Sequence, residues 1–474
     1  MFGNENKMRL ENLSDKGLRL LCYAIVALPL LLYGCTTNSK SNNPWSQLEE
    51  IKAKIKPPTF PDRDCLITDY GAVEGGEILN TDAIALAIQD CYEQGGGRVV
   101  VPEGTFLTGA VQLLSNINLH LKAGATLLFS RSPEDYLPMV PSRYEGVQYL
   151  NYSPFVYAYD QKNIAITGSG TLDGNASENY WWNWAHEYDD RELLMQMNAD
   201  EVSTYDRKFG PGHHLRPNFV QFIRSKNILI FGVTLTRSPM WNIHPVLSEN
   251  ITVDSIRIES LGPNNDGVNP ESSKNVWIKN SYFDTGDDCI AIKSGRNQDG
   301  RRIGVPSENI IIENNQMKDG NGGVVIGSEI SGGVRNVFAQ NLTMDSPNLE
   351  RVLRIKTSSK RGGVVENVNI RNIEVGQFRE AAIKINMFYG DPGDFMPTVR
   401  DVTVENLTVS NGGEYGIMIR AYEESPVQNI RIENTTINSV EIPTEIKNTE
   451  NLELENVEIN GEVVTSENIS AAAS

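Results

Sequence analysis

Short segments in which apolar and polar residues alternate recur along most of the chain. Each segment begins with asparagine or aspartate, places Val, Ile or Leu at every second position, and leads into a turn rich in Asn, Gly and Ser. The repeats are spaced by about 22 to 34 residues and begin at Asn227, Asn250, Asn275, Asn309, Asn336, Asn367, Asp401, Asn429 and Asn451, with weaker copies at Asn116 and Asn163. An alternation of period two predicts strands and not helices.

A repeat of this length cannot bury its own apolar face, so it must stack on its neighbours. Strand repeats without intervening helices predict an all-β fold, a single-stranded right-handed parallel β-helix. Equivalent positions on successive coils would then lie about 4.8 Å apart, and the leading asparagines would form an internal ladder. A β-sandwich or propeller is the alternative, but closely spaced hairpin signals such as Asn-Gly are few.

One long domain is expected over residues 61–465, because a solenoid grows by adding coils and 474 residues need no domain break. Residues 80–90 predict a capped amphipathic helix that covers the open N-terminal end of the β-helix. The glycine-rich segment 95–102 then leads into the first coil. Residues 466–474 form a C-terminal tail.

The N-terminus resembles a bacterial lipoprotein signal. Basic residues precede an apolar stretch from about Leu20 to Leu32, which is too short for a comfortable membrane span and ends at Leu32-Tyr33-Gly34-Cys35. We expect residues 1–34 to be a signal peptide, Cys35 to be lipidated, and residues 35–60 to be a tether. A non-cleaved signal anchor is the alternative. Either form places the protein at a membrane, with the lipoprotein at the periplasmic or cell-surface side of a bacterium.

The cysteines and histidines form no zinc pattern, and we expect neither a metal nor a cofactor. An oxidising compartment permits a Cys65–Cys91 disulfide, which the sequence leaves open. Cys289 is expected to be a buried thiol of the core.

A formal net charge of −19 makes nucleic acid an improbable partner. The same charge means that a polyanionic substrate needs a local basic patch. Arg354 and Lys356 are two residues apart on a predicted strand and therefore share a face, although a solvated strand would look the same.

Carboxylates gather in Asn264-Asn265-Asp266-Gly267 and, about twenty residues later, in Gly286-Asp287-Asp288. If one coil separates the two segments, the three carboxylates lie on one wall. Glycoside hydrolysis needs such an arrangement, because an inverting site separates an acid and a base by about 6.5–9.5 Å to hold a water molecule. Carboxylates this close also repel one another, so at least one should keep its proton near neutral pH.

The chain resembles glycoside hydrolase family 28, the polygalacturonase family of pectin hydrolases. The likeness runs from about Ile67 to Leu454. It is carried by residues 104–109, 159–174 and 283–295, and by the ordered set Asn-x-Asp, Gly-Asp-Asp, Ile-Gly-Ser and Arg-Ile-Lys. The resemblance implies a pectin-lyase-like solenoid and inverting hydrolysis of α-linked galacturonic acid bonds in a pectic oligo- or polysaccharide.

The resemblance also implies roles for individual residues. Asp287 would be the general acid, and Asp266 and Asp288 would together activate water. Arg354 and Lys356 would hold the substrate carboxylate. The remaining expected substrate contacts are Asn264, Tyr389, His244 and Lys293. We expect a monomer.

Two positions depart from the family pattern. Asn321 stands where the family usually has a histidine, and it can hydrogen-bond but cannot titrate. Asn269 stands where an acidic residue is frequent. These departures bear on the substrate and the rate more than on the fold.

The segment between Gly174 and Asn218 is rich in aromatic residues: Tyr180, Trp181, Trp182, Trp184, His186, His213 and His214. Such a loop can stack on sugars and close one end of a groove, or it can pack as a satellite hydrophobic cluster. Together with Trp241 and His244 it favours exo action. A rhamnogalacturonan or side-chain galacturonosidase, a calcium-dependent pectate lyase and a non-catalytic pectin-binding lipoprotein remain as alternatives.

Overall fold

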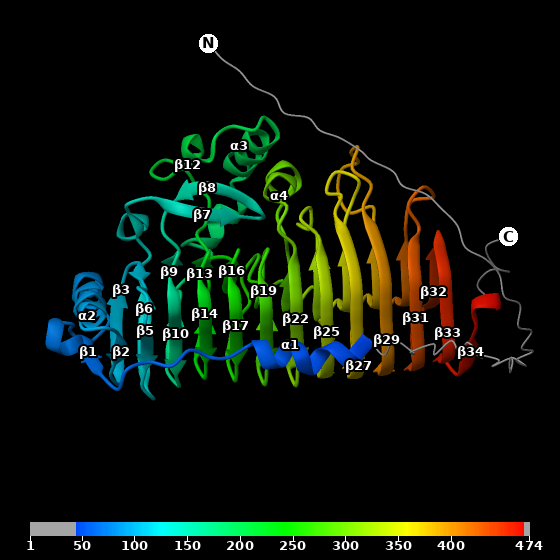
Figure 1. Cartoon of the computed structure of the whole chain (residues 1–474), viewed down its shortest axis with the longest axis horizontal. Coiled ribbons are helices and arrows are strands. Elements are labelled where there is room, and N and C mark those ends of the chain that lie inside the picture. Colours follow the sequence, from blue (N-terminus) through cyan, green and yellow to red (C-terminus); the bar gives the residue numbers. More distant parts are fainter. Residues whose placement is uncertain (1–43, 469–474) are drawn as a thin grey trace, which may run out of the picture. The chain divides into compact units, whose positions relative to one another are not determined.

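A computed structural model describes residues 44–468, which fold as a parallel β-helix (Figure 1). The predicted fold class is confirmed. Each coil places short strands on three stacks, and within each stack the strands pair in parallel. The expected signal peptide, Cys35 and the last residues of the tail lie outside the described residues.

The strands of the first two stacks are consecutive along the chain, and from β25 onward one long strand serves both stacks. The first stack contains β1 (Asp64–Leu66), β2 (Gly97–Val101), β5 (Ile117–Leu121), β10 (Lys162–Gly168), β14 (Lys226–Phe231), β17 (Glu249–Asp254), β19 (Lys274–Lys279) and β22 (Ser307–Glu313). The second contains β3 (Gly104–Thr108), β6 (Ala125–Phe129), β11 (Thr171–Asp173), β15 (Thr234–Thr236), β18 (Arg257–Ser260), β20 (Tyr282–Thr285) and β23 (Gln316–Met317). The shared strands are β25 (Val334–Met344), β27 (Val364–Gln377), β29 (Thr398–Asn411), β31 (Val427–Ile437) and β33 (Thr449–Ile459), and β34 (Glu462–Val464) pairs antiparallel with β33.

The third stack carries the residues that matter for function. It contains β4 (Val111–Gln112), β9 (Val156–Tyr159), β13 (Val220–Ile223), β16 (Ile243–Val246), β21 (Ile290–Ile292), β24 (Val324–Gly327), β26 (Arg351–Lys356), β28 (Ala381–Asn386), β30 (Tyr415–Arg420) and β32 (Ile442–Lys447). Single bridges through Val268 connect β16 to β21, so the stack is continuous there.

An antiparallel hairpin projects from the third stack. It consists of β7 (Val140–Tyr144) and β8 (Val147–Asn151), with β12 (Lys208–Phe209) paired to β8. Helices α3 (Tyr188–Ala199) and α4 (Asn297–Ile303) lie beside it (Figure 1). The hairpin and α3 come from segments far apart from α4 in the sequence, and together they build up one side of the third stack.

The predicted asparagine ladder is present. From Asn116 to Asn367, each leading asparagine donates its side-chain amide to the side-chain oxygen of the preceding one, at 2.8–3.2 Å. These residues have φ between 54° and 64°, a left-handed conformation that asparagine tolerates better than most residues. The asparagines therefore provide the left-handed backbone that each turn needs, and their side-chain amides hydrogen-bond to one another along the ladder.

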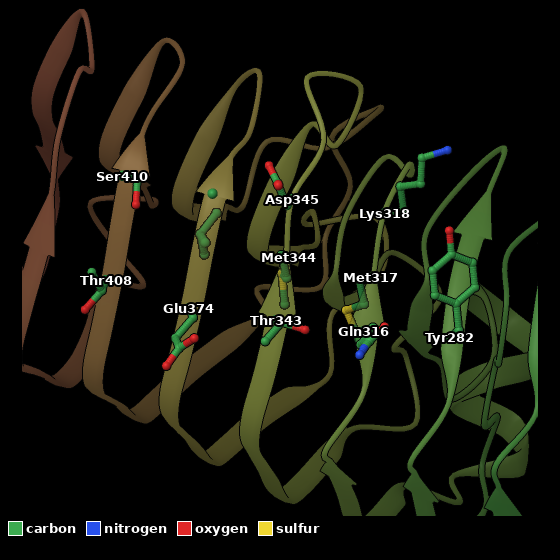
Figure 2. A pocket seen from close by; sticks show the side chains of 12 residues that line it. Tyr282, Gln316, Met317, Lys318, Thr343, Met344, Asp345, Glu374, Thr408 and Ser410 are labelled. Carbon is green, nitrogen blue, oxygen red and sulfur yellow. The ribbon is translucent and has the colours of Figure 1, made fainter.

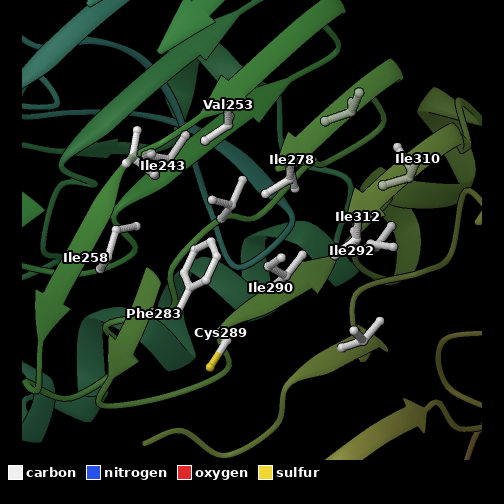
Figure 3. Packing of buried hydrophobic residues seen from close by; sticks show 14 of the residues in the cluster. Ile243, Val253, Ile258, Ile278, Phe283, Cys289, Ile290, Ile292, Ile310 and Ile312 are labelled. Atoms are coloured by element: carbon white, nitrogen blue, oxygen red, sulfur yellow. The ribbon is translucent and has the colours of Figure 1, made fainter. Parts of the chain in front are cut away.

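The interior of the solenoid is filled by the apolar residues of the alternating pattern. Figure 3 shows this packing where the coils meet, with Ile258 and Phe283 of the second stack and Ile290 of the third stack pointing inward. Cys289 lies in the same layer, and burial raises its pKa to about 12, as expected for an inert core thiol.

Helix α2 (Thr81–Glu93) caps the N-terminal end and buries Ile84, Ala87, Ile88 and Cys91 against the first coil (Figure 1). Asn80 does not cap this helix with its side chain. Its amide bonds to backbone groups of Val73, Ile78 and Leu107 instead. The thiols of Cys65 and Cys91 are both free and buried, and burial together with a hydrogen bond to Cys65 raises the pKa of Cys91 to about 12.

The expected tether over residues 35–60 is wrong for its described part. The 3-10 helix Pro44–Gln47 and helix α1 (Leu48–Lys54) pack along the outside of the first stack. Trp45, Leu48, Ile51 and Ile55 meet a flank made of Trp277, Ile311 and Phe338. The sequence did not predict this helix because the segment is too short to show a repeated apolar pattern. The helix is stabilised by its contacts with the apolar flank of the first stack.

We expect Trp45→Ala to release this segment. The Trp45 ring lies 5.6 Å from the Phe338 ring, and the guanidinium of Arg371 lies 3.9 Å above it. Removing a packed tryptophan costs about 3–5 kcal/mol. Limited proteolysis should therefore cut before residue 60 faster in this variant, with kcat unchanged. The exposed Ser46→Ala is the control, and equal cleavage of both variants would contradict the packing described here.

Candidate active site

The register of the third stack brings the three predicted carboxylates together. Val268 pairs with Ile290, which places Asp266 beside Asp288 on the neighbouring coil, one strand spacing away. The amide of Gly267 donates to the carbonyl of Asp288 at 2.9 Å. A Cβ at Gly267 would lie 2.3 Å from the carbonyl oxygen of Cys289, so only glycine permits this approach.

The carboxylates line a cavity of about 280 Å³. Its walls are strongly polar and come from the third stack, the hairpin and α3. The lining residues are Glu145, Arg191, Trp241, Asn264, Asp266, Asp287, Asp288, Lys293, Arg296, Asn321, Ser328, Glu329, Glu350, Arg351, Arg354, Lys356, Arg361 and Tyr389.

Asp287 has the electrostatics of a proton donor. Burial and the neighbouring Asp288 raise its pKa above the ordinary aspartate value, in spite of Lys356 and Lys293. Its Oδ1 accepts hydrogen bonds from the side-chain amide of Asn321 at 3.0 Å and from the backbone amide of Asp288 at 2.9 Å. A carboxyl group held protonated near neutral pH can act as a general acid.

Asp288 has the opposite character. Burial alone would raise its pKa, but the charges of Lys356 and Arg354 outweigh burial and lower it. Lys356 Nζ lies 2.8 Å from Oδ2, and Arg354 Nη1 lies 3.7 Å from Oδ1. Asp288 is therefore ionised, whereas the pKa of the adjacent Asp287 is raised. Two neighbouring carboxyl groups whose pKa values are shifted in opposite directions suit the roles of acid and base.

Asp266, expected to activate water together with Asp288, has an electrostatic environment different from that of Asp288. Burial and the nearby Asp287 raise its pKa well above the ordinary value, although Lys293 lies 3.8 Å away. The amide of Asn269 donates to Oδ2 at 2.9 Å, and Oδ1 has no partner among the described residues. Asp266 thus suits the orientation of a bound molecule more than the removal of a proton. The departure at Asn269 supplies an amide donor to this carboxyl group.

Arg354 and Lys356 lie on β26, two strands beyond β21, and reach back to Asp288. Gly327 stands between Lys293 and Lys356 in register, which leaves room for the Lys356 side chain. Tyr389 follows β28, and its ring centre lies 5.4 Å from both cationic groups. Arg354 and Lys356 form the basic patch that the sequence predicted, and Tyr389 lies beside it.

Asn264 and Lys293 also line the cavity as predicted. Asn264 accepts a hydrogen bond from Arg216 at 2.6 Å and approaches Asp287 at 3.5 Å. Lys293 bonds Glu329 at 3.1 Å and lies 4.9 Å from the centre of the Trp241 ring.

His244 does not line the cavity, so its expected substrate contact is wrong. Its side chain is fully buried between Gln221 at 2.8 Å and Glu271 at 2.7 Å. The strand alternation does point His244 away from the core. The hairpin then covers it, because Arg143 of β7 pairs with Glu271 at 3.3 Å.

The aromatic insertion takes the packed form of its two predicted alternatives. Trp181 is buried and makes edge contacts with Tyr136, Phe155 and Trp184. None of the seven aromatic residues of this segment lines the cavity described above. The insertion contributes Arg191 of α3 to the wall instead.

Seven charged residues of the cavity were not predicted from the sequence: Glu145, Arg191, Arg296, Glu329, Glu350, Arg351 and Arg361. Glu145 and Arg191 reach the site only because the hairpin and α3 fold back over the third stack. Glu329 and Arg361 stand directly after the Ile-Gly-Ser and five residues after the Arg-Ile-Lys motif, and that proximity was the available signal.

A larger cavity of about 570 Å³ lies on the second stack, between β20 and β29. Figure 2 shows its lining residues, among them Lys318, Asp345 and Glu374. These charged side chains are exposed, and a hydrogen bond to Asp284 raises the pKa of Lys318. The smaller cavity holds the shifted carboxyl groups, so we assign the site there.

Between residues 44 and 468 no three His, Cys, Asp or Glu side chains are arranged to hold a metal ion. The same residues include no helix long and apolar enough to cross a membrane.

We expect Asn321→Ala to shift the pH dependence of turnover. The hydrogen bond from Asn321 lowers the pKa of Asp287, so its loss raises that pKa further and keeps the acid protonated to higher pH. The alkaline limb of the profile of kcat/KM against pH should therefore move to higher pH. Asn348→Ala is a matched control, since its amide bonds Asp319 at 3.1 Å outside the cavity. An unmoved alkaline limb would contradict the contact with Asp287.

Comparisons with known proteins identify the family of this chain. The family model for glycosyl hydrolases family 28 matches residues 91–459. The solved structure of a hyperthermoactive exopolygalacturonase from Thermotoga maritima is 45% identical, has a TM-score of 0.83, and is matched over 87% of this chain and 95% of that one. A family 28 exopolygalacturonase from Yersinia enterocolitica is 25% identical, with a TM-score of 0.70 and coverage of 85% and 76%.

The exo-poly-alpha-D-galacturonosidase of Dickeya chrysanthemi is 31% identical over 389 residues, which are 73% of this chain and 62% of that protein. The match to the family model extends over most of the chain and includes every carboxyl group and cation discussed above. The chain belongs to glycoside hydrolase family 28.

Proposed function

We propose that this protein is an exo-acting polygalacturonase that hydrolyses α-linked galacturonic acid bonds in pectin with inversion. The observation that carries the proposal is the pair of adjacent carboxyl groups with opposite pKa shifts, set beside two cations in one cavity. The exo-acting relatives named above support the same activity.

The electrostatic environment of each residue indicates its role in the reaction. Asp287 donates its proton to the glycosidic oxygen as the bond to the anomeric carbon breaks. Asp288 takes a proton from the attacking water molecule, and Asp266 orients that water. Arg354 and Lys356 bind a uronate carboxylate by charge-assisted hydrogen bonds.

The residues that form one wall of the cavity support action at chain ends. Glu145 of the hairpin and Arg191 of α3 line it together with Asp287 and Asp288. Arg191 and Glu145 lie 2.8 Å apart and so tie the insertion to the hairpin at this wall. A long polysaccharide running through the site would have to displace this ion pair.

The test compares product size with viscosity during digestion of unesterified polygalacturonate. Exo action predicts one short product from the first time point and little loss of viscosity at low conversion. A ladder of intermediate oligomers with a rapid fall in viscosity would show endo action. Separate digestion of homogalacturonan and rhamnogalacturonan, with identification of the released sugars, identifies the pectin fraction.

We also propose that Cys35 carries a lipid that anchors the enzyme to a membrane. The support is the basic and apolar stretch that precedes Cys35. Cys35→Ala should abolish labelling by a fatty-acid probe in the native host and move the protein to the soluble fraction. Unchanged labelling and fractionation would contradict the anchor.

A further inference from the structure

A second group of cations lies at the end of the cavity that the hairpin covers. Arg361 sits in the loop after β26, five residues beyond Lys356, and Arg296 follows β21. Both side chains line the cavity. Neither residue takes part in the chemistry derived above.

Arg361 is a buried cation without a carboxylate partner. It is only 7% exposed, and no carboxylate oxygen of the described residues lies within ion-pair distance. Its Nη1 donates to Asn297 at 2.7 Å, while its buried Nε has no hydrogen-bond partner among the described residues. Burial and the nearby Arg296 lower its pKa to about 10. A buried, unpaired guanidinium is costly unless a ligand supplies the missing anion.

The surrounding charges leave this end of the cavity positive. Glu145 is shared by Arg191 and Arg296, and Glu329 is shared by Lys293 and Arg296. Lys293 also lies 3.8 Å from Asp266, whose pKa is raised by burial. Four cations, Arg361 included, therefore face two carboxylates of lowered pKa, Glu145 and Glu329. The cationic excess lies in a protein whose net charge is −19, so it is a local feature of this wall.

The first basic patch does not need Arg361. Arg354 and Lys356 already bracket Asp288 and suffice for one uronate carboxylate. Successive units of a polygalacturonate each carry one carboxylate, so a substrate that places one unit at Arg354 and Lys356 offers another to a neighbouring cation.

We propose that Arg361, flanked by Arg296, binds the carboxylate of a second galacturonate unit, adjacent to the unit held by Arg354 and Lys356. The substrate class rests on the proposed function. Arg361 is then a specificity-determining residue that makes the enzyme select two consecutive acidic sugars. A guanidinium suits this role, because its planar fork can bind a carboxylate through two parallel hydrogen bonds.

The test uses Arg361→Gln and Arg361→Lys in the full-length protein. Lys360→Gln is the matched control, because it removes the same charge from the preceding residue. Lys360 is an exposed lysine that pairs with Asp391 at 2.8 Å. The substrates are a galacturonate oligomer and the same oligomer with its carboxylates reduced to alcohols. We expect Arg361→Gln to lower kcat/KM on the acidic oligomer about 10- to 100-fold, mostly through KM.

On the reduced oligomer, Arg361→Gln and wild type should behave alike, and Arg361→Lys should recover part of the loss on the acidic one. Thermal stabilisation by the non-hydrolysed product should fall in Arg361→Gln and persist in Lys360→Gln. Equal kinetics of Arg361→Gln and Lys360→Gln would overturn the inference while leaving wild-type turnover, and with it the proposed function, intact. An equal loss on both oligomers would also overturn it, because the effect would then be structural.

Discussion

Replacing Asp287 with asparagine should abolish turnover and leave substrate binding nearly unchanged. The amide has the shape of the carboxyl group but cannot give a proton to the leaving oxygen, and general acid catalysis contributes about 10²- to 10⁴-fold. Burial and the neighbouring Asp288 raise the pKa of Asp287, which favours the protonated form that this step requires. The measurements are kcat on polygalacturonate and calorimetric binding of an oligogalacturonate.

Asp284→Asn provides the control for this substitution. Asp284 is also largely buried and pairs with Lys318 at 3.0 Å, three residues from Asp287 but outside the cavity. Its loss should leave kcat near the wild-type value. Retention of more than about a tenth of wild-type kcat in Asp287→Asn would remove Asp287 from the acid role.

Replacing Lys356 with methionine should have the second largest effect, because Lys356 serves two purposes. Its ammonium group lies 2.8 Å from Asp288 and lowers the pKa of that carboxyl group, and it also faces the expected substrate carboxylate. We expect kcat/KM to fall by about 2–4 kcal/mol equivalent. The pKa of Asp288 should rise towards the unpaired value, so the acidic limb of the pH profile should move to higher pH.

Two comparisons separate these effects from a general loss of charge. Lys318→Met removes a half-exposed lysine from its pair with Asp284 and should change kcat/KM little. Methyl esterification of the substrate should weaken wild type more than Lys356→Met, since the variant has already lost the interaction. Equal sensitivity of both enzymes to esterification would place the substrate carboxylate elsewhere.

Much of the fold was predictable because its signal is local and repeated. Alternation of period two fixes which side chains face the interior, and the leading asparagines mark each turn, as the ladder from Asn116 to Asn367 shows. The positions of Asp266, Asp287, Asp288, Arg354 and Lys356 followed from the same periodicity. Adjacent coils must bring equivalent positions together.

The remaining features depend on parts of the chain that meet only after folding. The alternation places His244 outside the core, but only the hairpin residue Arg143 reveals that this outer position is covered. Glu145 and Arg191 enter the cavity through the same long-range contact. The segment at Trp45 has no repeat of its own and is held by an apolar flank distant in sequence.

The protonation of the site was likewise only partly foreseeable. Repulsion among three carboxylates predicted that at least one would hold a proton, but not which. The structure separates them by their neighbours. Asp288 has Lys356 and Arg354 close by and stays charged, whereas the cation nearest to Asp266 among the described residues is Lys293, at 3.8 Å. The distribution of cations therefore favours Asp288 as the base in the proposed reaction.

The most direct test of the account follows the anomeric protons of the product by proton NMR during the first minutes of digestion of an oligogalacturonate. Hydrolysis with Asp287 as the acid and Asp288 as the base, on opposite faces of the sugar, predicts that the new reducing end appears first as the β-anomer, before mutarotation. Release of the α-anomer first, or of an unsaturated sugar in place of a hydrolysis product, would contradict it.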